Sequence, residues 1–95
     1  MIVGVLKLSL FLRGSRSLKE KRHVLKKIKD RINSRFNVSI AEVEASGSWE
    51  RFYLGISVVG DDSKYINSVL DKIKSHIDNL YLAEILDSEF ELINC

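Results

Sequence analysis

The chain has little of what a small protein needs to hold a metal, a disulfide or a cofactor. Its one cysteine is Cys95, so a single copy can form neither an internal disulfide nor a cysteine-rich zinc site. Its two histidines, His23 and His76, have no partner His, Cys or carboxylate at ligand spacing. We therefore expect no metal and no cofactor, and we expect packing alone to stabilise the fold.

The chain also lacks proline, internal repeats and any apolar run long enough to cross a membrane. The longest apolar stretch, Met1 to Leu12, is interrupted by Lys7 and Ser9, and it is much shorter than the roughly 20 residues that a membrane span needs. A secretory signal would place basic residues before its apolar run, whereas here the alternation starts at Met1 itself. These absences predict a protein without a membrane span that works in the cytoplasm.

The composition that remains is that of an ordinary globular protein. Of the 95 residues, 45% are hydrophobic and 29% are charged. A chain of this length builds one hydrophobic core but buries too little surface to divide between two. We therefore expect residues 1–95 to form a single domain.

The charges are divided unevenly along the chain, although the net charge is only +2. Residues 1–41 hold eleven basic residues and two acidic ones, a local charge of +9. Residues 42–95 hold four basic residues and eleven acidic ones, a local charge of −7. Attraction to a polyanion depends on the local potential, so the basic first part is the feature that points to a partner.

The spacing of apolar residues predicts a strand followed by a helix in the first part of the chain. Residues 2–12 alternate between apolar residues and a mixed set, which is a strand pattern. Ser17 and Glu20 form a capping box, so a helix should begin at Leu18. One face of this helix is predicted to pack on a sheet through a stripe of apolar residues: Leu18, Val24, Leu25, Ile28 and Ile32.

The second part of the chain repeats this order with an additional strand. Alternation predicts strands from about Val38 to Glu44 and from Trp49 to Val59, with a hairpin turn between them. The sequence from Gly60 to Ser63 marks a helix start, and the last strand should run from about Leu82 to Ile93. The order β-α-β-β-α-β predicts an α+β, ferredoxin-like two-layer sandwich, with a four-stranded antiparallel sheet and two helices on one of its faces.

The first helix and the loop before it are the candidate nucleic-acid interface. Rotation by about 100° per residue turns most of the basic side chains away from the apolar stripe. We predict binding to RNA, for instance ribosomal RNA or the ribosome, through these side chains, with little sequence specificity. The alternative is a solvated helix face that neutralises Glu42, Glu44 and the acidic part of the chain. The candidate residues are Arg13, Arg16, Lys19, Arg22, Lys26, Lys27 and Lys29.

The sheet face away from the helices is a candidate protein interface. If the alternation holds, this face carries apolar, aromatic and basic side chains that a second copy of the chain could cover. The third strand does not match the pattern of an RNA-recognition sheet, so a homodimer contact is the simplest cover for this face. A non-enzymatic accessory protein that binds RNA is the predicted function, and a homodimeric interaction scaffold with no nucleic-acid role is the alternative. The candidate interface residues are Val3, Val5, Trp49, Arg51 and Tyr53.

Catalysis has weak support. The Arg13–Ser17 loop joins a strand to a helix N-terminus, an arrangement that attracts phosphate and that small acylphosphatases share. The third strand offers Tyr53 and Ser57 and no asparagine to orient an attacking water. No serine has a recognisable histidine and acid partner, so we assign no catalytic residue and expect a protein that is not an enzyme.

Four blocks of residues resemble a known family in both sequence and order. They are Met1–Leu6, Ser17–Arg22, Phe36–Val43 and Leu54–Gly55, and the resemblance that they carry extends over nearly the whole chain. They are similar to the YlxP-like family of small bacterial proteins, a domain of unknown function often encoded near translation factors. The resemblance implies a ferredoxin-like fold and no activity. This chain departs from the family at Gly47–Glu50, where many relatives read more like Asp-x-Trp-Gln.

Overall fold

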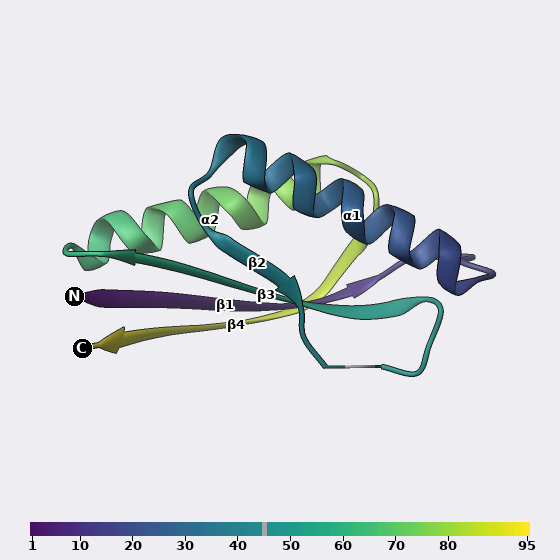
Figure 1. The fold of residues 1–95 in the computed structure, drawn as a ribbon, viewed down its shortest axis with the longest axis horizontal. Helices are drawn as coiled ribbons and strands as arrows, with labels where there is room; N and C mark the ends of the chain where they lie inside the picture. The colour runs from purple at the N-terminus through teal and green to yellow at the C-terminus, as the bar shows by residue number, and fades with distance from the viewer. Residues whose placement is uncertain (45) are drawn as a thin grey trace.

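One antiparallel sheet forms the lower layer of the molecule in Figure 1, and two helices form the upper layer. The computed structural model describes residues 1–44 and 46–95. The order of elements is the predicted one, and it confirms the ferredoxin-like two-layer fold. The elements are β1 (Ile2–Phe11), α1 (Leu18–Arg35), β2 (Ser39–Glu42), β3 (Arg51–Gly60), α2 (Ser63–Asn79) and β4 (Glu84–Asn94).

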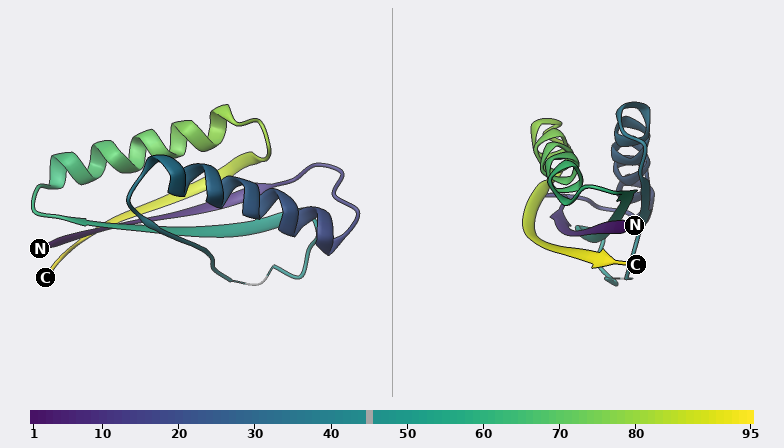
Figure 2. Two further views of the ribbon diagram at one scale, coloured as in Figure 1. Left: turned by 45° about the horizontal axis from the view of Figure 1, so that its top comes forward. Right: turned by 90° about the vertical axis from the view of Figure 1, so that its left-hand side faces the viewer.

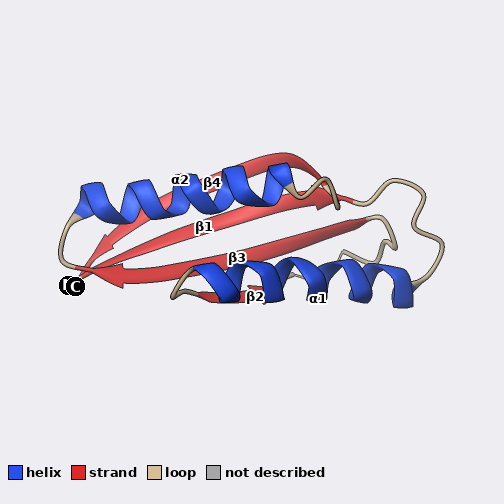
Figure 3. Cartoon of the chain, turned by 90° about the horizontal axis from the view of Figure 1, so that it is seen from above, coloured by secondary structure: helices blue, strands red, loops and turns tan. Residues whose placement is uncertain are grey.

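The sheet has the strand order β2-β3-β1-β4, with all neighbours antiparallel. Seen from above, α1 lies over β2 at one edge, and α2 lies over β1 and β4 toward the other edge (Figure 3). Both helices cover the same face, so the other face of the sheet, the open face, has no helix on it (Figure 2). The fold therefore places the first helix and the last strand on opposite edges of the molecule.

The core lies between the sheet and the helices. Alternate residues of the two central strands point into it because side chains along a strand alternate between faces. Gly4 of β1 allows α2 to approach closely, since a Cβ atom at this position would collide with the Ile66 side chain and lie 3.0 Å from Leu70 Cδ1. The largest fully buried side chains are Phe52, Leu8, Leu10, Ile28, Ile32, Leu54, Ile56, Ile66, Leu70, Ile73 and Ile77.

Two strand boundaries differ from the prediction in a way that matters for the site. β2 ends at Glu42, two residues before its predicted end, and β3 begins at Arg51 rather than Trp49. Glu44 has a φ of 57°, which is the left-handed conformation and is incompatible with a continuing strand. Trp49 therefore lies in the connection between the strands and is not part of the sheet.

Across residues 1–44 and 46–95, neither helix combines the length and the apolar character that crossing a membrane requires.

Candidate nucleic-acid interface

The start of α1 is fixed by side-chain hydrogen bonds. The Glu20 backbone N–H donates to Ser17 Oγ at 3.1 Å, so Ser17 is the helix cap that the sequence predicted. Glu20 Oε2 accepts from the backbone N–H of Arg16 at 2.7 Å. In a standard capping box the donor is the N–H of the cap residue itself, which here is Ser17. The prediction that a helix begins at Leu18 is confirmed.

The buried face of α1 contains a lysine that the sequence pattern did not single out. Leu25, Ile28 and Ile32 are buried as predicted, whereas Leu18 is exposed. Lys21 is only 5% exposed, and it is the one buried charged residue in the described part of the chain. A signal for this was present, because Lys21 precedes Leu25 by four residues and Ile28 by seven, and so falls on the apolar stripe.

Lys21 connects α1 to the segment between β2 and β3. Its Nζ donates to Ser46 Oγ at 3.1 Å and to the Ser48 carbonyl at 2.8 Å. The Glu42 carboxylate lies 3.9 Å from the same nitrogen. These contacts compensate the burial of the ammonium group and hold residues 46–50, here called the Trp49 segment, against the first turns of the helix.

The basic side chains of α1 divide into two groups. At about 100° per residue, four of them fall within an arc of about 80° and extend about 15 Å along the helix. Within the described residues, Lys26 is the only one of the four that forms an ion pair, with Asp30 at 2.9 Å. We call this group the basic stripe, and its members are Lys19, Arg22, Lys26 and Lys29.

The structure separates the basic stripe from other predicted binding residues. Lys27 is exposed but lies about 140° around the helix from Arg22. Arg13 and Arg16 are exposed in the loop before α1. Arg35 lines a cavity with residues of α2, whereas Arg22 lines one with the Trp49 segment, so the stripe is on the side of α1 away from α2.

A cavity of about 370 Å³ lies beside the basic stripe, between α1 and the Trp49 segment. Two leucines of α1 give it an apolar wall, and the Trp49 side chain, which is 56% exposed, lies at its border. We call it the Trp49 cavity. It is lined by Leu18, Lys21, Arg22, Leu25, Glu42, Ser46, Gly47, Ser48 and Trp49.

The five residues of the predicted protein interface do not all lie on one surface. Val3, Val5, Arg51 and Tyr53 all point to the open face, as their pairing register requires. The prediction that Trp49 also lies on the open face was wrong. β3 starts only at Arg51, and Trp49 lines the cavity beside α1 instead.

The chain itself covers part of the open face. Lys7 Nζ forms an ion pair with Glu44 and lies 5.5 Å from the centre of the Tyr53 ring. The hydrogen bond to Glu44 raises the pKa of Lys7. Val43 lies over Gly55, where a Cβ atom would come within 2.8 Å of Val43 Cγ1. Glu44 is therefore paired with a lysine of β1, whereas Glu42 lies 3.9 Å from a lysine of α1, Lys21.

The loop proposed as a phosphate site is occupied by carboxylates. The Gly14 N–H donates to Glu50 Oε2 at 3.2 Å, and the Arg16 N–H donates to Glu20. The Arg13 guanidinium lies 5.9 Å from the centre of the Phe11 ring. Two amides of this loop, those of Gly14 and Arg16, are thus already paired with carboxylates.

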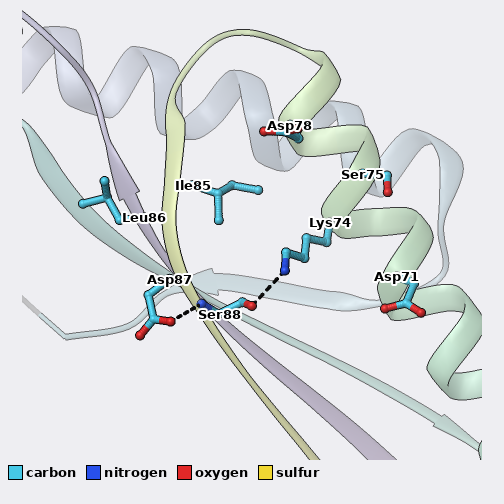
Figure 4. Close-up of a pocket in the computed structure, with 8 residues that line it drawn as sticks. All are labelled: Asp71, Lys74, Ser75, Asp78, Ile85, Leu86, Asp87 and Ser88. Atoms are coloured by element: carbon cyan, nitrogen blue, oxygen red, sulfur yellow. Dashed lines mark hydrogen bonds between the residues drawn. The ribbon is translucent and has the colours of Figure 1, made fainter.

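A larger cavity, of about 760 Å³, lies between α2 and β4 at the opposite edge of the molecule (Figure 4). Its only basic residue is Lys74, which donates to Ser88 Oγ at 3.0 Å. Its carboxylates come from Asp71, Asp78 and Asp87. This edge is acidic and repels a polyanion.

Comparison with known families identifies the chain. A family model described as a protein of unknown function, DUF503, matches residues 3–90. The chain belongs to the DUF503 family. YlxP of Bacillus subtilis (strain 168), an uncharacterized protein, is 40% identical over 63 residues, which are 66% of this chain and 68% of YlxP. The YlxP-like resemblance read from the four sequence blocks is confirmed.

Solved structures similar to this DUF503 chain support the fold. The match to the structural-genomics protein YJCS covers 97% of this chain and 99% of YJCS, at 13% identity and a TM-score of 0.61. The match to the de novo designed protein Foldit4 covers 100% of this chain and 99% of Foldit4, at 18% identity and a TM-score of 0.56. The match to the designed protein LFR1 1, which has a ferredoxin fold, covers 98% of this chain and 84% of LFR1 1, at 12% identity and a TM-score of 0.51. At these identities the likeness shows the fold alone.

Proposed function

We propose that this DUF503 chain binds RNA through the basic stripe of α1, with Arg13 and Arg16 extending the contact. The observation that carries the proposal is the grouping of four cations on one side of a helix, with one ion pair among them in the described residues. Successive members lie three or four residues apart, about one helical turn of 5.4 Å. Such a row can contact successive phosphates of one strand.

The fold turns the uneven charge along the sequence into an uneven charge in space. α1 lies at one edge of the sheet, and α2 with β4 lies toward the other (Figure 3). The acidic cavity is between α2 and β4. A polyanion is attracted to the first edge and repelled by the second, so binding has one preferred orientation. This supports a contact with a large structured RNA, such as ribosomal RNA.

The salt dependence of binding tests this proposal. About four phosphate contacts predict that log K falls with log salt concentration with a slope of about −3 to −4. Raising the salt from 50 to 200 mM should therefore weaken binding by about 60- to 250-fold. The measurement is a titration of purified ribosomal subunits and of a mixed RNA pool across this range. A slope near zero, or no binding at low salt, would refute the proposal.

A second candidate function is self-association through the open face. Val3 pairs with Val59 on one side and Ile93 on the other, so the three side chains form a row across the sheet. Val59 is 60% exposed and Ile93 is 40% exposed. Arg51 lines a cavity of this face together with Asp87 and Glu89, so a second copy related by a two-fold axis can match opposite charges.

The oligomeric state tests the second candidate. We expect sedimentation equilibrium to give twice the monomer mass at micromolar concentrations if the row is an interface. Val59→Lys should restore the monomer, because it places a charge in the apolar row. A monomer at every concentration would exclude this candidate without affecting the RNA proposal.

A further inference from the structure

We propose that the Trp49 cavity receives an unpaired nucleobase of the RNA whose phosphates bind the basic stripe. The inference rests on the proposed function and adds the class of ligand that enters the cavity. RNA-binding proteins commonly stack splayed-out bases on aromatic rings and on arginine planes. Trp49 and Arg22 provide one of each at the border of the same cavity.

The charges of the cavity favour a base over a phosphate inside it. Glu42 lines the cavity, and its carboxylate is partly exposed. Among the described residues, the ammonium group that faces Glu42 is that of Lys21, and it is already hydrogen-bonded to Ser46 and Ser48. A phosphate inside the cavity would meet this carboxylate, whereas Arg22 at the border can contact a phosphate from the stripe side, so we expect phosphates on the stripe and a base inside.

The Trp49 segment is ordered by its own hydrogen bonds. Ser48 Oγ accepts from the backbone N–H groups of Glu50 and Arg51, at 3.1 and 3.3 Å. Ser46 Oγ accepts from the Ser48 N–H at 3.2 Å and donates to the Arg51 carbonyl. The hydroxyls of Ser46 and Ser48 are thus occupied, so the cavity offers a base mainly stacking contacts, with the Glu42 carboxylate as the remaining polar group.

This mode of recognition has two consequences. Stacking is available to every base, so we expect little sequence preference. It needs an unstacked base, so we expect single strands and loops to bind more tightly than a fully paired duplex of the same charge. The cavity volume of about 370 Å³ is within the range of small-ligand sites.

The experiment uses the fluorescence of Trp49, which is the only tryptophan in the chain. The probes are single-stranded oligouridine, an RNA duplex and inorganic polyphosphate, which has charge but no bases. We expect oligouridine to quench Trp49 and polyphosphate to bind without quenching. Trp49→Ala should weaken oligouridine binding by about 5- to 150-fold, measured by anisotropy of a labelled strand. It should change polyphosphate binding less than about twofold, because no stacking is lost.

Trp49→Phe is the matched control, since it keeps an aromatic plane and should retain most of the affinity for oligouridine. Circular dichroism of each variant separates a lost stack from a lost fold. Salt-sensitive RNA binding that Trp49→Ala leaves unchanged would overturn the inference while the proposed function stands. Equal weakening of oligouridine and polyphosphate would also overturn it. Absence of binding to every polyanion would overturn both.

Discussion

Replacement of Lys21 by alanine should lower the free energy of unfolding by about 2–4 kcal/mol. The substitution removes two hydrogen bonds from a charged donor, to Ser46 Oγ and the Ser48 carbonyl. It also removes the apolar stem of a side chain that is 5% exposed, which leaves a gap between α1 and the Trp49 segment. The measurement is urea denaturation, followed by circular dichroism and by Trp49 fluorescence.

Two further variants show which part of Lys21 matters. Lys21→Met keeps most of the stem and loses the charge, so its stability should lie between those of the wild type and Lys21→Ala. Lys27→Ala changes an exposed lysine of the same helix and should shift stability by less than about 0.5 kcal/mol. If Lys21→Ala were as stable as Lys27→Ala, Lys21 would not anchor the segment.

The fold was predictable because local signals agreed with one another. The Ser17 cap, the alternation of residues 2–12 and the apolar spacing of α1 each depend on neighbouring residues, and all three are confirmed. The end of β2 was harder to predict, since Glu42 and Glu44 continue the alternation although Glu44 turns into a left-handed conformation. A periodic pattern does not show where a strand loses its partner.

The candidate site was only partly predictable. The basic character of α1 is visible in the sequence, and rotation by 100° per residue accounts for the stripe. The role of Lys21 was missed because its partners, Ser46 and Ser48, are 25 and 27 residues away. Trp49 was assigned to the sheet because alternation extends to it, whereas the anchored segment turns it toward α1.

The position of the basic stripe, and not the net charge of the chain, is what we expect to produce RNA binding. Lys19→Glu with Lys26→Glu tests the stripe, and Lys64→Glu with Lys72→Glu in α2 is the matched control. Both pairs take the net charge from +2 to −2. A contact between charges in water is worth about 1 kcal/mol, so losing two contacts and adding repulsion should weaken binding by at least about 30-fold.

The measurement is the affinity of the wild type and both double variants for ribosomal RNA at one low salt concentration, with folding checked by circular dichroism. We predict a loss of at least about 30-fold for the α1 pair and less than about threefold for the α2 pair. Equal losses for the two pairs would show that only net charge matters, and an unchanged affinity of the folded α1 variant would contradict the assignment of the stripe.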